Sequence, residues 1–360
     1  MIFPEITLTG SPYEKGFTHG SVCREQVLRS LDSYGRRFKR SKDLMWEEAH
    51  QHAQKFLSLF TGEYARYIEE MHGIADGAGV AFEDILTINL RTELLYTDFV
   101  EAERGNMGCT AFSAVPPVTA GNITLAGQTW DFTRSQREAT VIARIPEEDG
   151  RPAILMFLEG GFVGGKGVNS AGISLTLNAL STKQGGIGIP LHIRMRRMLE
   201  SRTLNAAYRE ATAAPIPFGA NLILTHKDGI SLSLELDPSG VDVIMPENGI
   251  IAHTNHYYGP KMILNHSHSA GASTYVRLQR MLQLMKSRDA LTQADLESFC
   301  ADHAGSPSSI CTHPLPEHTP QQQLIDGATN YAFVIDLTNG IIRFACGNPC
   351  ENGFETISLE

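Results

Sequence analysis

Two tight hairpins in the second half of the chain constrain its fold more than any other feature. In the first, NLILTHKDGISLSLEL (221–236), strand-forming residues flank Asp228-Gly229; in the second, YAFVIDLTNGIIRFAC (331–346), they flank Asn339-Gly340. Both dipeptides suit the positive φ angles of a two-residue hairpin turn. Hairpins build antiparallel sheet, so the chain is not expected to alternate strands and helices as a Rossmann fold does.

The first third of the chain has a different pattern. Apolar residues recur there at intervals of three and four, with few helix breakers, which indicates amphipathic helices. Helices are predicted over 14–35, 44–60 and 62–78. Gly77 and Gly79 are expected to end the last of these, and a short helix is predicted to begin near Phe82.

The pattern changes after Arg104, where GNMG predicts a flexible break. Short segments rich in strand-forming residues follow, punctuated by Gly, Pro, Asp and Asn. Strands are predicted over 110–115, 123–130, 140–145, 153–158 and 172–180, and helices over 190–200, 203–213, 274–287 and 291–303. The glycine-rich VGGKG (163–167) lacks the ending of a phosphate-binding loop and predicts a turn between strands. Helices before, between and after antiparallel strands indicate the α+β class.

Composition and net charge exclude some classes of binding partner. Hydrophobic residues make up 42% and charged residues 19%, which is typical of a globular protein. The net charge of −10 argues against nucleic acid or an anionic membrane surface as a partner. No apolar run approaches the roughly 18 residues of a membrane span, and the opening MIFPEITLTG lacks a secretory signal, so we expect a cytoplasmic protein. The six cysteines are then expected to be reduced.

The dipeptide Gly108-Cys109 lies at the predicted boundary between helices and strands. Glycine lets the preceding peptide adopt strained conformations and be approached closely, so the thiol of Cys109 could attack the Gly108 carbonyl and cut the chain. The freed α-amine, with a pKa near 8, would then serve as base for the thiol of the same residue. A buried structural cysteine is the alternative for this dipeptide.

Eight segments are spread in order over nearly the full length: GSPYEKGFTHG (10–20), NLRTE (89–93), GCTAFS (108–113), GQTWDF (127–132), GVNSAGISLTLNAL (167–180), HTNH (253–256), STYVRLQRM (273–281) and DHAGSPSSICTH (302–313). Together they resemble the acyl-coenzyme A:6-aminopenicillanic-acid acyltransferase family, whose members are also called isopenicillin N acyltransferase-like or C45-type peptidases.

The resemblance implies a single N-terminal-nucleophile (Ntn) hydrolase domain over 1–360, with two antiparallel sheets between helical layers in the order αββα. It also implies cleavage between Gly108 and Cys109, which would give a helical fragment 1–108 and a nucleophile-bearing fragment 109–360.

Roles for site residues follow from the same resemblance. Cys109 is expected to be the nucleophile. Asp131 is expected to hold the α-ammonium and orient the thiol, with a turn aspartate as the alternative. Asn255 is expected to donate to the oxyanion, with a turn-capping asparagine as the alternative.

Three further residues are expected to bind substrate. Asn178 ends a predicted strand, where it either lines the pocket or points to solvent. Arg277 either faces the nucleophile or lies on the surface. Ser309 belongs to a segment that the resemblance places in a loop lining the site.

No metal and no cofactor is predicted. His253, His256, His266 and His268 lack a supporting set of acidic residues or cysteines. Cys346 and Cys350 are also poorly spaced for a metal.

Two other pairs suggest separate hypotheses. Cys311 and His313 could form a second thiol–base pair, although a structural or substrate-lining role is preferred for their segment. Arg91 and Glu93 could form a buried ion pair that holds the scissile loop, and a Glu93→Ala variant that still cleaves fully would refute this.

These features predict a self-processed cysteine amidohydrolase or acyltransferase that acts on a small N-acyl amide through a thioester. Acyl-coenzyme A is a candidate donor, and assembly into a homo-oligomer is left open. A non-catalytic binding protein on the same scaffold and a metal hydrolase built on the histidines are the alternatives.

Overall fold

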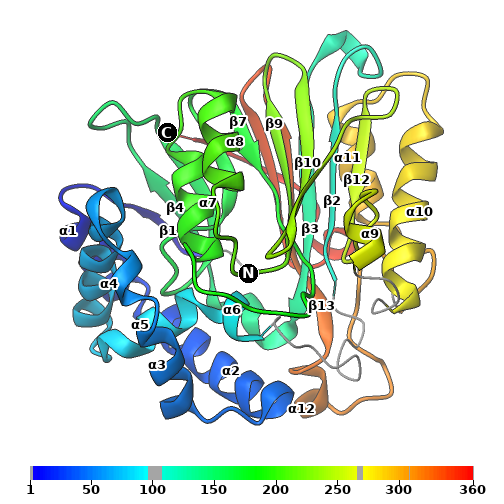
Figure 1. Cartoon of the computed structure of the whole chain (residues 1–360). Helices are drawn as coiled ribbons and strands as arrows, with labels where there is room; N and C mark the ends of the chain where they lie inside the picture. Colours follow the sequence, from blue (N-terminus) through cyan, green and yellow to red (C-terminus); the bar gives the residue numbers. More distant parts are fainter. Residues whose placement is uncertain (1–2, 96–107, 266–270, 308, 360) are drawn as a thin grey trace.

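The computed structural model describes residues 3–95, 108–265, 271–307 and 309–359, and its strands form two sheets that lie face to face (Figure 1). One sheet has nine strands in the order β1-β4-β5-β6-β7-β9-β10-β11, with β8 paired to β9. Its strands are β1 (Glu5–Thr7), β4 (Thr140–Ile145), β5 (Ile154–Glu159), β6 (Lys166–Asn169), β7 (Ile173–Leu175), β8 (Asn178–Ala179), β9 (Ala220–His226), β10 (Ile230–Asp237) and β11 (Gly240–Ile244).

The other sheet has six strands in the order β12-β2-β3-β13-β14-β15. They are β12 (Ile250–His253), β2 (Thr110–Ala114), β3 (Leu125–Thr133), β13 (Gly327–Asp336), β14 (Ile341–Cys346) and β15 (Glu355–Ile357). The predicted hairpins are β9–β10 and β13–β14, and Gly229 and Gly340 take the positive φ that their turns require.

Helices cover both outer faces of this pair of sheets. They are α1 (Pro12–Val22), α2 (Arg24–Lys42), α3 (Trp46–Gln54), α4 (Ala65–Ala78), α5 (Phe82–Asn89), α6 (Arg91–Leu95), α7 (Leu191–Leu199), α8 (Leu204–Thr212), α9 (Met262–Asn265), α10 (Ala272–Lys286), α11 (Gln293–Cys300), α12 (Pro320–Gln323) and α13 (Pro349–Asn352). Helices α7 and α8 pack on the nine-stranded sheet, whereas α10 and α11 pack on the six-stranded sheet. The first six helices gather beside the nine-stranded sheet (Figure 1).

The expected αββα order is therefore confirmed. The predicted antiparallel pairing has one exception, at the edge of the nine-stranded sheet, where β1 runs parallel to β4.

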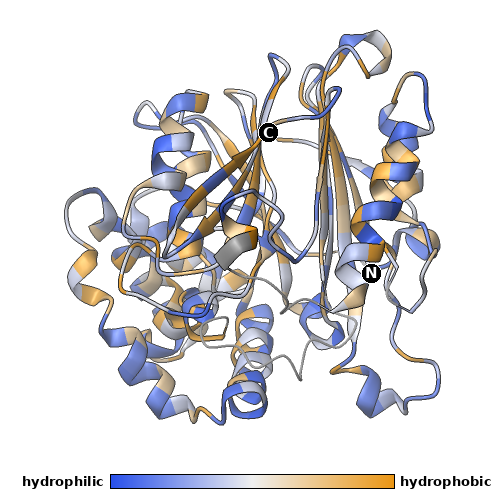
Figure 2. Cartoon of the chain, turned by 45° about the vertical axis from the view of Figure 1, so that its right-hand side comes forward, coloured by the Kyte–Doolittle hydropathy of each residue, from blue (hydrophilic) through white to orange (hydrophobic). Residues whose placement is uncertain are grey.

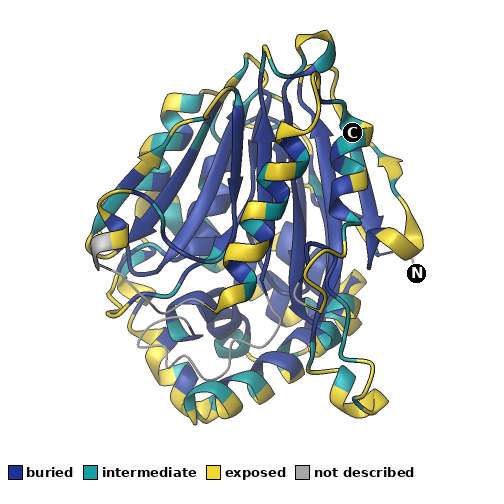
Figure 3. Ribbon diagram, turned by 90° about the vertical axis from the view of Figure 1, so that its right-hand side faces the viewer, coloured by how far each residue is buried: buried dark blue, intermediate teal, exposed yellow. Residues whose placement is uncertain are grey.

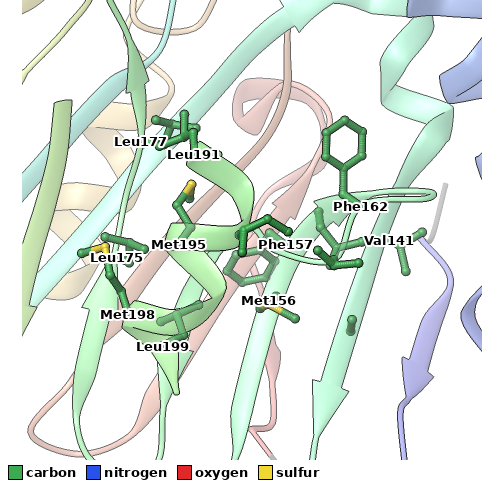
Figure 4. Close-up of a cluster of buried hydrophobic side chains, with 14 of the residues drawn as sticks. Val141, Met156, Phe157, Phe162, Leu175, Leu177, Leu191, Met195, Met198 and Leu199 are labelled. Carbon is green, nitrogen blue, oxygen red and sulfur yellow. The ribbon is translucent and has the colours of Figure 1, made fainter. Parts of the chain in front are cut away.

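Apolar side chains concentrate on the strands, and the outward helix faces are polar (Figure 2). The strands are accordingly buried, whereas the outer helix faces are exposed (Figure 3). Figure 4 shows one part of this core, where Met195 and Leu199 of α7 lie near Phe157 and Leu175 of the nine-stranded sheet. Burial of this kind supplies most of the driving force for folding.

Two sequence predictions on the first helices need correction. The helix predicted over 14–35 is broken at Cys23 into α1 and α2, and Gly77 lies inside α4 rather than at its end. A Cβ on Gly77 would lie 2.4 Å from the carbonyl oxygen of Phe17, so the glycine lets α1 and α4 pack backbone to backbone. Gly79, in the left-handed conformation, ends α4 as predicted.

The strand predicted over 172–180 is also interrupted, between β7 and β8. Gln128 reaches this break from β3 of the opposite sheet. Its carboxamide donates to the Leu177 carbonyl at 2.7 Å and accepts from the Leu177 N–H at 2.8 Å. The side chain thus replaces a strand neighbour and links the two sheets beside Asn178.

Within the described ranges, no helix has both the length and the apolar character needed to cross a bilayer. Residues 105–107 of the predicted flexible break lie outside the described residues.

Candidate active site

Cys109 immediately precedes β2, deep between the layers, with 3% of its surface exposed. Its Sγ lies 3.7 Å from the backbone carbonyl oxygen of Asp131 on the neighbouring strand β3. Burial, together with the charge of Asp131, raises the pKa of the Cys109 thiol to about 12. The positive charges of Lys166 and Arg277 oppose this rise in the pKa. In this state the thiol is protonated at neutral pH.

The carbonyl oxygen of Cys109 accepts two hydrogen bonds from side chains that are distant in sequence. Arg277 Nη1 on α10 donates at 2.7 Å, and Asn178 Nδ2 on β8 donates at 3.0 Å. Asn221 Nδ2 in turn donates to Asn178 Oδ1 at 3.1 Å, which fixes the orientation of that amide. The buried Asn178 and Arg277 therefore both face the residue predicted to be the nucleophile, and neither points to solvent.

Asn255 follows β12 and lies against Gly108. Its Oδ1 accepts from Arg277 Nη2 at 3.1 Å, and its Nδ2 donates to the Ala179 carbonyl at 3.0 Å. A Cβ on Gly108 would lie 2.2 Å from Arg277 Nη2 and 2.6 Å from Asn255 Oδ1. Real Cβ contacts are longer than this, so the two side chains close around the peptide only because residue 108 is glycine.

Asp131 is buried near the end of β3, beside the hydroxyl groups of Thr129, Thr312 and Thr329. Thr329 Oγ1 donates to Asp131 Oδ1 at 2.7 Å, and Thr312 Oγ1 donates to Oδ2 at 3.3 Å. Burial raises the pKa of the Asp131 carboxyl to about 7, although Arg277 and these hydroxyls lower it. A bulge in β13 between Thr329 and Tyr331 lies opposite Asp131, and bulges commonly re-aim side chains beside active sites.

Ser309 is buried, and Thr312 lies between it and the Asp131 carboxylate. Ser309 Oγ donates to the Cys311 carbonyl at 2.6 Å. The Ser309 carbonyl lies 2.8 Å from Thr312 Oγ1 and shares the single proton of that hydroxyl with Asp131. These contacts hold Thr312 beside Asp131. The predicted substrate contact of Ser309 stays a prediction.

Three residues of this site were not predicted from the sequence: Lys166, Thr312 and Thr329. Lys166 Nζ lies 3.2 Å from the centre of the Trp130 ring. Burial lowers its pKa to about 7, against the influence of Glu159 and Cys109. VGGKG (163–167) was predicted to be a turn between strands, but its last two residues, Lys166 and Gly167, begin β6. Only the pairing of β6 in the sheet brings its lysine to the thiol.

Arg91 and Glu93 are both buried on α6. Arg91 Nε lies 3.6 Å from Glu159 Oε2, and Glu93 Oε1 accepts from the Leu191 N–H at 2.7 Å, at the start of α7. Burial raises the pKa of Glu93 to about 7. Residues 96–107 lie outside the described residues, so the hypothesis that this pair holds the scissile loop stays a prediction.

The histidines considered for a metal hydrolase do not gather around one point in the described part of the chain. His253 Nε2 lies 2.9 Å from Glu235 Oε1, and its Nδ1 lies 2.8 Å from the Thr254 carbonyl oxygen. Both ring nitrogens are thus occupied. His266 and His268 lie outside the described residues.

Comparison with known proteins identifies relatives of the chain. Residues 118–349 match the family described as acyl-coenzyme A:6-aminopenicillanic acid acyl-transferase. The acyl-coenzyme A:6-aminopenicillanic-acid-acyltransferase 40 kDa form of Emericella nidulans is 30% identical over 315 residues, which cover 85% of this chain and 84% of the relative.

Solved structures also show similarity. A Caenorhabditis elegans N-acylethanolamine-hydrolyzing acid amidase ortholog is 13% identical, with a TM-score of 0.45, over 64% of this chain and 93% of its own. A mutant of the Clostridium perfringens conjugated bile acid hydrolase is 12% identical, with a TM-score of 0.43, over 69% and 96%. At this level of similarity we draw nothing from these structures about the chemistry of this chain. On the matches of sequence, the chain belongs to the acyl-coenzyme A:6-aminopenicillanic acid acyl-transferase family and is an enzyme that acts on C–N bonds.

Proposed function

We propose that this enzyme is a self-processed cysteine amidohydrolase or acyltransferase whose nucleophile is the thiol of Cys109. The observation that carries the proposal is the convergence of Asn178, Asn255 and Arg277, from three separate segments, on Cys109 and the glycine before it. Asn178 and Arg277 hold the carbonyl of Cys109, and Arg277 Nη2 lies against Gly108, where a buried guanidinium can stabilise charge that develops as the Gly108 carbonyl is attacked.

Activation begins with cleavage of the chain between Gly108 and Cys109. The Cys109 sulfur attacks the Gly108 carbonyl carbon, and the thiol proton passes to the Cys109 nitrogen as the C–N bond breaks. Water then adds to the resulting thioester, which yields a Gly108 carboxylate and restores the thiol. The products are the fragments 1–108 and 109–360.

Cleavage supplies the base that the thiol needs. Before cleavage, burial keeps the Cys109 thiol protonated, since its pKa is raised to about 12. The new α-amine titrates near pH 8, within reach of the sulfur of its own residue, so it can take the thiol proton. The carboxylate of Asp131, whose charge already influences the Cys109 thiol, would hold the α-ammonium, and that contact would favour the charged form of the amine.

The mature enzyme then acts on a small N-acyl amide. The thiolate adds to the acyl carbon, Asn255 donates to the oxyanion, and the α-ammonium returns the proton to the leaving amine. Water or a second amine attacks the thioester, giving hydrolysis or acyl transfer. The name of the Emericella relative supports acyl-coenzyme A as a donor and a small amine as the acceptor.

Trapping of the acyl-enzyme tests this proposal. Purified protein is incubated with a panel of N-acyl amides and acyl-coenzyme A thioesters, quenched in acid, and its intact mass and peptides are analysed. We expect the mass of one acyl group on fragment 109–360, located at Cys109 and released by hydroxylamine.

Cys346→Ser, which changes a cysteine outside the site, should acylate normally. Turnover that survives Cys109→Ala would overturn the proposal. So would an acyl group found on Cys311, the thiol of the alternative Cys311–His313 pair.

A further inference from the structure

A second group of nucleophilic and metal-ligating side chains lies outside the Cys109 site. It consists of His303, Cys311 and His313, from the segment between α11 and β13, and Cys350 of α13; we call it the Cys/His cluster. One ligand atom from each residue lies within 4.8 Å of all the others. Cys311 is buried, whereas His303 and Cys350 are exposed, so ions in solution can reach the cluster.

Four of the six ligand–ligand distances in the Cys/His cluster match the edges of a tetrahedron around one ion, and the two from His303 to the sulfurs are at most 4.8 Å. With Zn–S bonds near 2.3 Å and Zn–N bonds near 2.05 Å, a tetrahedron has edges of about 3.8 Å between sulfurs, 3.3 Å between nitrogens and 3.6 Å between sulfur and nitrogen. The two Sγ atoms are 3.6 Å apart, and the two Nε2 atoms are 3.1 Å apart. His313 Nε2 lies 3.7 Å from Cys311 Sγ and 3.3 Å from Cys350 Sγ. Each of these four distances is therefore close to the edge expected around zinc.

Polar neighbours complete the cluster as they do in metal sites. His313 presents Nε2 to the cluster, while its Nδ1 lies 3.6 Å from Glu351 Oε1. Asn348 Nδ2 donates to Cys311 Sγ at 3.5 Å, and Arg137 Nη2 donates to Asn348 Oδ1 at 2.7 Å. A carboxylate behind a ligating histidine and an amide donor to a thiolate are typical partners of metal ligands.

We propose that the Cys/His cluster binds one structural Zn²⁺ ion through two thiolates and two imidazoles. Four protein ligands leave no open position for substrate, so the ion would stabilise the fold rather than catalyse. Soft thiolates with imidazoles in a tetrahedron favour zinc among the common divalent ions. A Cys311–Cys350 disulfide explains less, because it uses only the two sulfurs and leaves unexplained why two imidazoles converge on the same point.

The ion would tie the segment 303–313 to α13, and it would do so next to the catalytic site. Thr312 lies between Cys311 and His313, and its Oγ1 donates to Asp131. Zinc would therefore hold Thr312 in place as a positioning residue, without touching the reacting atoms.

The sequence did not reveal this cluster, because one ligand lies 37 residues beyond the nearest of the others. When no metal was predicted from the sequence, Cys350 was compared only with Cys346, as a pair of possible ligands.

Metal content tests the inference independently of activity. The full chain is purified without chelators, zinc is measured by elemental mass spectrometry, and the metal-free protein is titrated with Co²⁺. We expect one zinc per chain and the visible absorption of tetrahedral, thiolate-bound cobalt. Cys109→Ala should keep its zinc, since the active-site thiol is not a ligand. Cys346→Ser is the matched cysteine control and should also keep it.

Two exposed ligands offer variants that are expected to fold. Cys350→Ser and His303→Ala should each lower zinc affinity by more than the roughly 10–100-fold that loss of an outer partner costs, whereas Glu351→Gln should fall within that range. Circular dichroism checks that each variant is folded. Wild-type protein that neither retains zinc nor binds cobalt would overturn the inference. A native Cys311–Cys350 disulfide, or full zinc binding by the Cys350→Ser, His303→Ala double variant, would also overturn it.

Discussion

The two cysteine sites of this protein differ in what surrounds the sulfur. Cys109 is enclosed by carbonyl oxygens, amides and the cations Arg277 and Lys166, with no histidine among its hydrogen-bond partners in the described ranges. Cys311 is also buried, and burial raises its pKa to about 12, but two imidazoles and a second thiol lie beside it. Burial alone therefore does not decide the use of a thiol. In our account, Cys109 becomes a nucleophile when cleavage gives it an amine, whereas Cys311 becomes a ligand when a metal ion displaces its proton to solvent.

The largest expected effect separates the two sites. Cys109→Ala should lower turnover of N-acyl amides by roughly 10⁴-fold or more, because it removes the nucleophile. Zinc content should not change. Cys350→Ser should lose zinc and turn over more slowly, because Thr312 is no longer held, but its Cys109 should still acylate. Steady-state kinetics, acyl trapping and metal analysis check this, and either loss of zinc from Cys109→Ala or a folded Cys350→Ser protein that no longer acylates would contradict the separation of the sites.

Asp131 comes next in expected effect. Asp131→Asn keeps the shape of the side chain but removes the charge that would hold the α-ammonium, so kcat of the cleaved enzyme should fall roughly 10²–10⁴-fold. Asp336→Asn, a change to another buried aspartate of the same sheet, is the control and should leave kcat unchanged. A cleaved Asp131→Asn enzyme with normal kcat would show that Asp131 is only a structural residue of β3.

Gly108 should matter for cleavage but not for turnover. In Gly108→Ala the added methyl group displaces Arg277 or Asn255, and overpacking of about 1–3 kcal/mol corresponds to cleavage slowed by about 10–100-fold. Once cut, residue 108 is no longer linked to Cys109, so the matured variant should turn over normally. Gly271→Ala, at a position with open space, is the matched control. A time course on denaturing gels measures the rate, and cleavage at the wild-type rate would refute the close contact.

The last expected effect concerns stability rather than catalysis, as a dependence of the free energy of unfolding on pH. Because burial raises the Asp131 pKa from 3.8 to about 7, the folded chain binds the proton more tightly than the unfolded chain. The resulting stability is fully present below pH 3.8 and is lost as pH rises through about 7, at about 1.4 kcal/mol per unit of pKa difference.

Urea unfolding of the uncleaved Cys109→Ala chain at several pH values measures this loss. Asp131→Asn in that background should flatten the curve between these limits. An unchanged curve would mean that Asp131 is ionised in the folded chain.

The sequence indicated several residues of the candidate site but not the contacts that bring them together. The dipeptide Gly108-Cys109 marked the change from helical sequence to strands, but by itself it also allowed a buried structural cysteine, and the resemblance to the family favoured a nucleophile there. The parts played by Asn178, Asn255 and Arg277 came from resemblance, since each joins the site only through the packing of separate segments.

Thr329 and Lys166 could not be predicted. One depends on a bulge opposite Asp131 and the other on the pairing of β6 with its neighbours. Likewise, the interruption between β7 and β8 depends on a glutamine from the other sheet, which no local pattern contains.

The mass of the purified wild-type protein tests the central claim most directly. We predict two fragments, spanning 1–108 and 109–360, with Cys109 as the first residue of the larger one and a single uncut chain for Cys109→Ala. A wild-type protein that hydrolyses N-acyl amides while it remains one chain of 360 residues would contradict the account.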